Sequence, residues 1–117
     1  SPDHCLVSVF VEVEIKIAYD RITAHYCLVS VFVEVEISHA MTQQDTDKYG
    51  LTKTMLTRRC ISVIENPRKM KRLITDVLYS MNISNVYDIG INIQILTEAF
   101  RNEVYEHAIF KFTWKIT

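Results

Sequence analysis

An eleven-residue sequence, Cys-Leu-Val-Ser-Val-Phe-Val-Glu-Val-Glu-Ile, occurs twice in this chain, at Cys5–Ile15 and again at Cys27–Ile37. Apolar residues fill every second position and Val, Ile and Phe dominate, which predicts β-strands with one buried face. The first half of each copy is apolar on both faces, which predicts that this half is covered on both sides. The repeat is either a genuine duplication or an artificial addition to the chain. Because the copies are offset by an even number of residues, both can turn the same face inward within one sheet.

The two copies are expected to be antiparallel neighbours, Cys5–Tyr19 paired with Tyr26–Ile37. In parallel register each glutamate of one copy would lie beside the same glutamate of the other, Glu12 beside Glu34 for example, and like charges in that position are destabilising. A hairpin sets the glutamates opposite Ser30 and its neighbours instead. Such a long apolar ribbon also favours aggregation unless its edge is covered.

The size and composition of the chain indicate one globular domain, residues 1–117, with 49% hydrophobic and 23% charged residues. Its apolar runs are far shorter than the roughly 20 residues that a membrane-spanning helix needs, so no membrane partner is expected. The first residues also lack the features of a signal peptide. Three cysteines without a C-x-x-C pair favour small core residues in a reduced protein over a disulfide framework or a zinc site.

Two helices are predicted in the middle of the chain, over 47–64 and over Asn66–Met81. The first follows good N-cap residues, Asp45 to Asp47, although Cys60–Ile64 by itself also fits a strand. The second begins at Asn66-Pro67, with Asn as the cap and Pro at the first helical position. Apolar residues then recur at helical spacing and form a stripe that should face the core: Met70, Leu73, Ile74, Val77, Leu78 and Met81.

The last third of the chain, 86–117, is expected to form two closing strands. Alternation runs from Tyr87 to Ile95 and again from Val104 to Ile116, with a turn at Arg101–Glu103. With the hairpin at 5–37 and the helices at 47–81, the order is β-β-α-α-β-β. The predicted fold class is therefore α+β, an antiparallel or mixed β-sheet with two helices packed on one face.

The sequence contains no recognisable catalytic or cofactor chemistry. The four histidines lack ligand spacing such as H-x-x-x-H, and the two glycines stand alone, without a phosphate-binding loop. Glu12 and Glu14, like Glu34 and Glu36, are paired carboxylates, but no nucleophile or oxyanion hole accompanies them. No catalytic, cofactor-binding or metal-binding residue is predicted, and the chain is not expected to be an enzyme.

Charge is segregated along the chain. Residues 1–47 carry eight acidic residues against two basic ones, whereas residues 48–72 carry eight basic residues against Glu65 alone. Four of the cations follow Asn66 directly, in the first turns of a helix, where the helix dipole disfavours each by roughly 0.3–1 kcal/mol. Their cluster is either a solvated helix face or a surface for a polyanion or an acidic partner. No aromatic or glycine residues are interleaved with it, so a sequence-specific nucleic-acid reader is not indicated.

The order of elements resembles that of the tail terminator (tail completion) proteins of long-tailed bacteriophages, the lambda type in particular. Cys5–Tyr19 and Tyr26–Ile37 are similar to the long hairpin of that family. Asp45–Glu65 and Asn66–Met81 are similar to its two helices, which are broken near a proline. Val86–Thr117, ending in the aromatic alternation Ile109-Phe-Lys-Phe-Thr-Trp-Lys-Ile116, is similar to its closing strands.

The resemblance implies a structural virion protein without catalytic residues or cofactors. Six copies would close a ring on the end of the tail tube and join it to the head connector, after assembly in the cytoplasm of the host bacterium. Charge segregation suits such a ring, because a heterologous contact needs two complementary faces on each subunit. The expected interface joins acidic strand surface to basic helix surface: Glu34, Glu36, Arg58, Arg59, Arg68, Lys69, Lys71 and Arg72. Non-specific DNA in the lumen of the ring is a further partner that the basic cluster could contact.

Two other classes of function fit the same residues. One is a small non-catalytic interaction module that takes up a partner strand at an exposed sheet edge. The other is a small enzyme or a nucleic-acid binder that uses the basic helix. The mass in solution tests the first alternative against a ring, and the salt dependence of nucleic-acid binding tests the second.

Overall fold

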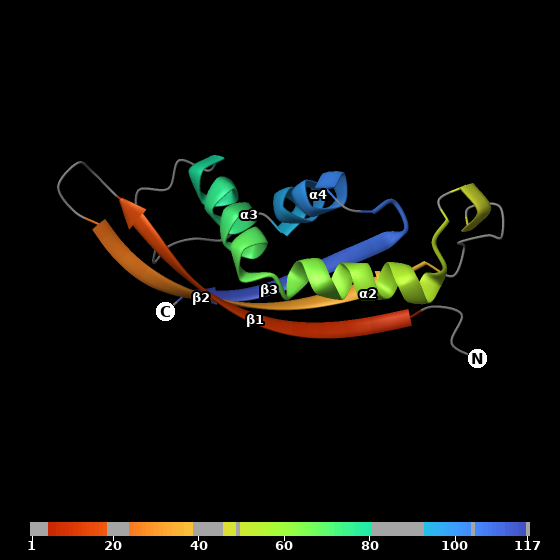
Figure 1. Ribbon diagram of the computed structural model, residues 1–117. Helices are drawn as coiled ribbons and strands as arrows, with labels where there is room; N and C mark the ends of the chain where they lie inside the picture. The colour runs from red at the N-terminus through yellow and green to blue at the C-terminus, as the bar shows by residue number, and fades with distance from the viewer. Residues whose placement is uncertain are drawn as a thin grey trace.

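The structure is a computed structural model that describes residues 5–18, 24–38, 46–48, 50–80, 93–103 and 105–116. These residues form three strands, three longer helices and a single helical turn at 46–48 (Figure 1). The longer elements are, in chain order, β1 (Cys5–Ala18), β2 (Ala24–Ile37), α2 (Lys53–Ile64), α3 (Pro67–Ser80), α4 (Ile93–Glu103) and β3 (Ala108–Ile116).

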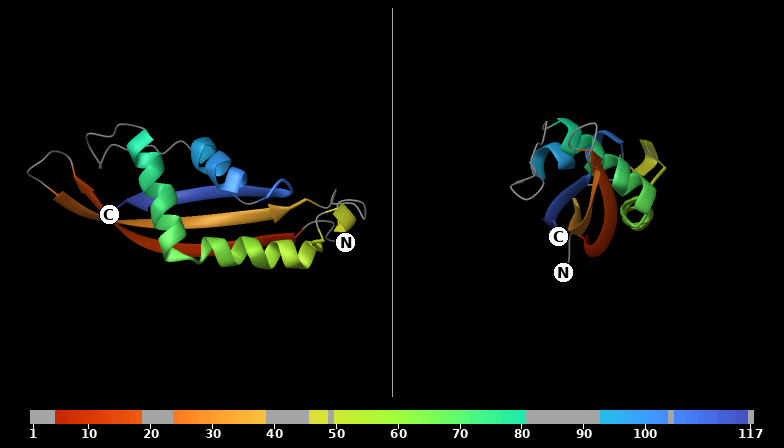
Figure 2. Two further views of the ribbon diagram at one scale, coloured as in Figure 1. Left: turned by 45° about the horizontal axis from the view of Figure 1, so that its top comes forward. Right: turned by 90° about the vertical axis from the view of Figure 1, so that its left-hand side faces the viewer.

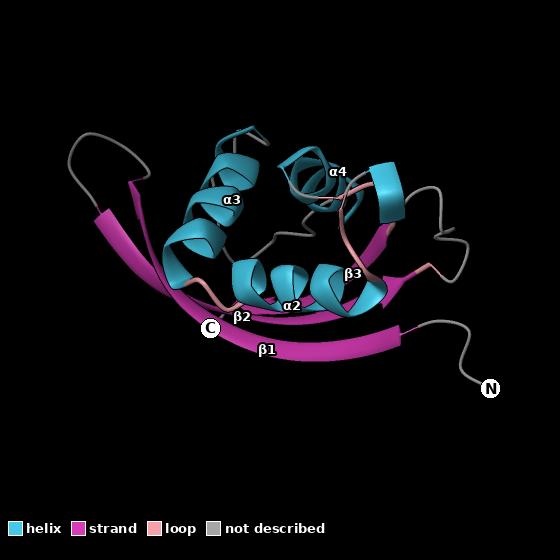
Figure 3. Ribbon diagram, turned by 45° about the vertical axis from the view of Figure 1, so that its right-hand side comes forward, coloured by secondary structure: helices cyan, strands magenta, loops and turns pink. Residues whose placement is uncertain are grey.

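The strands form one antiparallel sheet in the order β1-β2-β3. The sheet is curved, and α2, α3 and α4 all lie on its concave side (Figures 1 and 3). An end-on view shows the twist of the strands beneath this single layer of helices (Figure 2). The predicted α+β class, with an antiparallel sheet and helices on one face, is confirmed.

The predicted hairpin is also confirmed, and its register has an unusual property. Cys5 lies opposite Ile37, Phe10 opposite Phe32 and Ala18 opposite Ala24. Because the two copies of the repeat are identical, this register pairs the eleven-residue sequence with itself, with phenylalanine opposite phenylalanine at its centre. The predicted placement of a glutamate opposite Ser30 is confirmed. Glu12 lies opposite Ser30, whose Oγ donates a hydrogen bond of 3.4 Å to Glu12 Oε1.

The core lies between the sheet and the helices. Alternate residues of β1 and β2 point to the helices and are buried, from Val9 to Ile15 and from Cys27 to Ile37. Phe110 and Phe112 of β3 meet Phe100 of α4, whose ring centroid is 4.3 Å from that of Phe110. Burial of large apolar side chains of this kind contributes about 1.5–3 kcal/mol each and is what holds the helix layer on the sheet.

The helix predicted over 47–64 begins later than expected. The prediction that the acidic residues before 48 start the helix is wrong. Thr52 is the N-cap, and its Oγ1 accepts a hydrogen bond of 3.2 Å from the backbone N–H of Met55. Gly50, with φ of 64°, separates the turn at 46–48 from α2 in a left-handed conformation that glycine adopts without strain. The predicted end at residue 64 is confirmed, so Cys60–Ile64 is helical and not a strand.

The second predicted helix is confirmed as α3. Asn66 caps it: its Oδ1 accepts hydrogen bonds from the backbone N–H of Arg68 at 3.1 Å and of Lys69 at 3.2 Å. Pro67 is the first helical residue. All members of the predicted stripe that lie in α3 are buried, namely Met70, Leu73, Ile74, Val77 and Leu78. Met81 lies outside the described residues.

The predicted order β-β-α-α-β-β with two helices is wrong in its last third. Residues Ile93–Ile95, expected to end a strand, begin α4, and Arg101–Glu103, expected to be a turn, end the same helix. The physical reason is the pair Leu96 and Phe100, spaced by one helical turn, which are 1% and 0% exposed beneath the helix. The rest of the expected strand, 87–92, lies outside the described residues. The closing strand is confirmed as β3, although it begins at Ala108 and not at Val104.

Candidate interaction surfaces

The protein presents two broad surfaces, the helix layer and the outer face of the sheet, and the predicted interface residues are divided between them. Glu34 and Glu36 belong to β2 and alternate with buried valines, so they lie on the outer face. The basic residues lie on the helical side: Arg58 and Arg59 on α2, and Arg68, Lys69, Lys71 and Arg72 on α3. The two groups are therefore on opposite sides of one subunit.

The outer face is less acidic than the sequence of its first two strands indicates. Glu34 lies opposite Lys111 of β3, and Ser30 lies opposite Lys115. Among the described residues, this face carries four glutamates and three lysines: Glu12, Glu14, Glu34, Glu36, Lys16, Lys111 and Lys115. Since β3 comes from the far end of the chain, it brings cations that the segregation along the sequence does not reveal.

The outer face also carries exposed apolar side chains. Leu6 is 58% exposed and Phe10 is 61% exposed, and Phe10 lies directly opposite Phe32. Further members of this apolar patch are Tyr26, Leu28 and Ile109. The expectation that the first half of each repeat is covered on both sides is wrong for the described part of the chain, because all three long helices lie on the other face. The signal for this patch was already present in the even-numbered apolar positions of the repeat.

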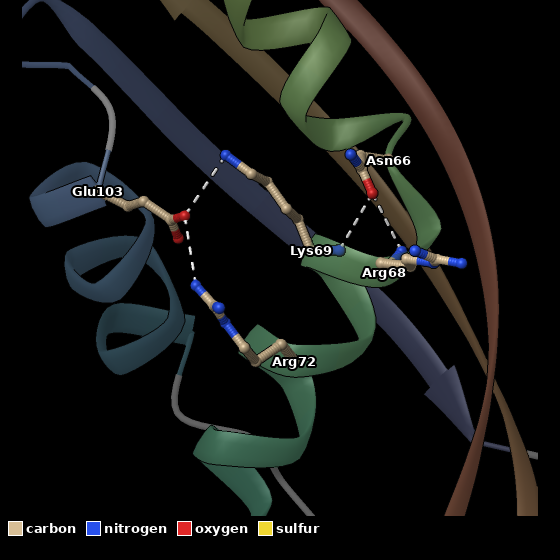
Figure 4. Close-up of polar contacts among 5 residues, drawn as sticks. All are labelled: Asn66, Arg68, Lys69, Arg72 and Glu103. Atoms are coloured by element: carbon tan, nitrogen blue, oxygen red, sulfur yellow. Dashed lines mark hydrogen bonds and ion pairs between the residues drawn. The ribbon is translucent and has the colours of Figure 1, made fainter.

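Within the part of the chain that the structure describes, two of the six basic residues have an acidic partner. Lys69 Nζ lies 3.5 Å from Glu103 Oε1, and Arg72 Nη2 lies 3.7 Å from the same oxygen (Figure 4). Glu103 is the last residue of α4, which the sequence alone placed in a turn. These are partly exposed ion pairs, each worth no more than about 1 kcal/mol.

Two of the other basic residues, Arg58 and Arg68, lie at the junction of α2 and α3. A shallow hollow of about 700 Å³ lies there, lined in part by Arg58, Arg68, Glu65 and Pro67. Within the ranges that the structure describes, neither Arg58, Arg68 nor Lys71 has an ion pair. Arg59 differs, because its side chain forms a hydrogen bond with Tyr105. Burial raises the pKa of the Tyr105 phenol, and Arg59 opposes that rise.

Cys27 and Cys60 are core residues, as predicted. Burial raises the pKa of the Cys60 thiol to about 12, and it raises that of Cys27 as well. A thiol with a raised pKa is protonated at neutral pH and is a poor nucleophile and metal ligand. Among the described residues no group of three histidines, cysteines or acids could hold a metal ion, and no helix there is long and apolar enough to cross a membrane.

Comparison with known proteins gives no relative: no family model, no curated protein and no solved structure matches this chain. What the two surfaces can bind is therefore judged from their own chemistry.

Proposed function

We propose that this chain is a non-catalytic structural protein that works by associating with other protein subunits. The observation that carries the proposal is the difference between its two faces. The helix side presents Arg58, Arg68 and Lys71 without ion pairs among the described residues, whereas the outer sheet face combines glutamates with exposed Leu6 and Phe10. A subunit with two unlike surfaces can build a head-to-tail contact, which closes into a ring when the rotation between subunits allows it.

In its most specific form the proposal is a hexameric ring of the tail terminator kind. Such a ring would cap the tail tube of a long-tailed phage, contact the head connector and become part of the virion after assembly in the host bacterial cytoplasm. Support comes from the long hairpin, from the break between α2 and α3 at Pro67, and from the aromatic closing strand β3. The third long helix, α4, has no counterpart among the two helices on which the resemblance to tail terminators is based.

The structure sharpens which residues such a contact would use. Lys69 and Arg72 already contact Glu103, and Glu34 has Lys111 across from it. The contact is therefore assigned mainly to Arg58, Arg68 and Lys71 on one subunit. Glu12, Glu14 and Glu36 are the acidic residues they would meet on the next. Non-specific DNA in the ring lumen is the alternative partner for the same cations.

The test is the mass in solution over a range of concentrations, for the wild type and for Arg58→Glu/Arg68→Glu/Lys71→Glu. The wild type should form a fixed multiple of 13.7 kDa that weakens at high salt, because charges at the rim of an interface are screened. The triple variant should stay folded and lose the oligomer. Lys115→Glu adds an acidic residue to the outer face that the cations would meet, so it should keep the oligomer. An oligomer that the triple variant forms as well as the wild type would overturn the proposed contact.

A second candidate function, a module that takes up a partner strand, is favoured by one specific observation. β1 is at the edge of the sheet, and only β2 pairs with it among the described strands. Strand addition to such an edge gives affinity through the backbone, and side chains on alternate positions give specificity.

A further inference from the structure

The edge of β1 is long and weakly protected. The strand has 14 residues, and its only charged residues are Glu12, Glu14 and Lys16, all in the second half. The opposite edge strand, β3, has two lysines in nine residues, and lysines on an edge are a common device against unwanted pairing. The half of β1 without charges is also the half in which Leu6 and Phe10 are more than half exposed. The two edges of the sheet therefore differ, and β1 is the edge suited to pairing.

The hairpin shows which sequence pairs with β1 on the edge that faces β2. β1 already pairs with one copy of its own sequence, because the residues of β2 from Cys27 to Ile37 repeat those from Cys5 to Ile15. In this register Ser8 lies opposite Glu34, the repeat counterpart of Glu12, and Phe10 lies opposite Phe32, its own counterpart. The pairing is thus two-fold symmetric about Phe10 and Phe32, and the sequence is complementary to itself when it runs antiparallel.

We propose that the free edge of β1 pairs antiparallel with β1 of a second copy of this chain, in the register that β1 makes with β2. The two-fold axis would pass between the Phe10 residues of the two copies. Both sheets would join into one, in the order β3-β2-β1-β1-β2-β3, with both helix layers on the same face. This proposal rests on the second candidate function, the strand-edge module, and names its partner.

The charges of the repeat select this partner and this direction. In the proposed register Glu12 lies opposite Ser8 of the second copy and Glu14 lies opposite Leu6, so no like charges meet. The same types of pair occur within the hairpin, where the Ser30 hydroxyl donates a hydrogen bond to Glu12. A parallel arrangement would instead place Glu12 beside Glu12 of the second copy, which is unfavourable. The exposed Phe10 gains an aromatic neighbour across the axis, as it has Phe32 on its other side.

The repeat itself supplies a matched pair of variants, Phe10→Lys and Phe32→Lys. In the first, two cations face each other across the proposed two-fold axis. In the second, the same change at the same repeat position falls on β2, which is flanked by β1 and β3 of its own chain. Sedimentation should show a wild-type dimer that persists at high salt. Phe10→Lys should raise the dimer dissociation constant at least about tenfold, since like charges directly opposite are destabilising, and Phe32→Lys should leave it within about threefold.

Mixing tests the symmetry of the contact. Phe10→Lys and Phe10→Glu should each dimerise more weakly alone than the wild type, but an equimolar mixture of the two should form a heterodimer that native mass spectrometry resolves. The register is tested by cysteine cross-linking in a Cys5→Ser background. Phe10→Cys should give a disulfide-linked dimer, because residues directly opposite in an antiparallel pair have Cβ atoms about 4.5–5.5 Å apart, close to disulfide geometry. Ser8→Cys should not, because its partner position is Glu12.

The outcomes separate this proposal from the charged ring contact. An oligomer that survives Phe10→Lys but dissociates in the Arg58, Arg68 and Lys71 triple variant overturns the edge pairing and leaves the ring proposal standing. The reverse result supports edge pairing and overturns the ring contact. Cross-linking through Ser8→Cys as efficient as through Phe10→Cys overturns the proposed register, and a wild type that is monomeric at every concentration overturns the dimer.

Discussion

Lys69, in the first turns of α3, lies 3.5 Å from Glu103, the last residue of α4. Each of these charges is at the end of a helix where the dipole of its own helix disfavours it, by roughly 0.3–1 kcal/mol. Because the start of α3 meets the end of α4, the two misplaced charges offset each other, and Arg72 adds a second contact with the same carboxylate oxygen. Tertiary structure thus accounts for two of the cations that helix electrostatics alone left unexplained.

Glu103→Gln is expected to lower the free energy of unfolding by up to about 1 kcal/mol at low ionic strength, since it leaves two cations near a helix N-terminus without their partner. Urea unfolding in low salt and in about 1 M salt checks this, because screening should remove most of the difference. Glu103→Gln in a Lys69→Met/Arg72→Met background is the control. An equal loss in that background would show that the effect does not come from the ion pairs.

Ile74→Ala is expected to destabilise the protein by about 2–5 kcal/mol, the usual cost of truncating a large aliphatic core side chain. Ile74 is 0% exposed on the face of α3 that packs against the sheet. Lys71→Ala, on the exposed face of the same helix, should change stability by less than about 0.5 kcal/mol. Chemical denaturation of both variants measures the contrast. Equal effects would mean that the buried face of α3 is assigned wrongly.

Asn66→Ala should cost about 0.5–2 kcal/mol, because it removes the side-chain oxygen that accepts from two backbone N–H groups at the start of α3. Asn66→Asp is the matched control, since it keeps the acceptor and adds a negative charge at the favourable end of the helix. Thermal unfolding should therefore rank the aspartate variant at or above the wild type and the alanine variant below both. A neutral alanine variant would show that this cap contributes nothing to stability.

The stability of the protein should fall with rising pH above about pH 9 for a reason specific to Cys60. Burial raises the pKa of this thiol from 9.0 to about 12 in the folded protein. Between these values the folded state keeps a proton that the unfolded chain has lost, so the free energy of unfolding falls by up to about 1.4 kcal/mol per pH unit. The contribution is fully present below pH 9 and disappears as the pH approaches 12.

Urea unfolding of the wild type and of Cys60→Ala at about pH 8 and about pH 10.5 measures this effect. Other groups titrate in the same range, so the informative quantity is the difference between the two pH slopes. The alanine variant is less stable at pH 8 because of its cavity, but its slope should be shallower. Parallel slopes would show that the Cys60 thiol does not titrate differently in the two states.

The parts of the fold with strong periodicity were predictable from the sequence. The repeat predicts a hairpin because three features favour one antiparallel pairing: its alternation of apolar residues, the even offset between its copies and the positions of its glutamates. α3 is predicted by an amphipathic stripe that follows the cap Asn66. α4 was missed because the alternation of isoleucines up to Ile95 also fits a strand. The helical spacing of Leu96 and Phe100 becomes evident only in the folded protein, where both are buried and Phe100 packs against Phe110 of β3. Tertiary packing decides between two local patterns in such a segment.

The candidate surfaces were predictable as residues but not as arrangements. The six cations do lie on one side of the subunit, yet Glu103 approaches two of them from a helix that the sequence did not reveal. Lys111 lies opposite Glu34 only because β2 pairs with β3, which joins positions far apart in the chain. Charge counts along a sequence therefore overstate how strongly the folded faces differ in sign.

The identity of the two repeats also bears on how the chain finds its fold. Rotating the hairpin by half a turn about an axis that passes between Phe10 and Phe32, perpendicular to the sheet, places each copy where the other was. The rest of the chain could therefore meet the same repeat side chains in two orientations. The two orientations differ in the strand residues beyond the repeat. They also differ in the connection after Ile37, which in one of them would have to start from the opposite end of the sheet. Competition between near-degenerate arrangements is local frustration, and we expect it to lead a fraction of refolding molecules through a trapped, misdocked intermediate before the native order is reached.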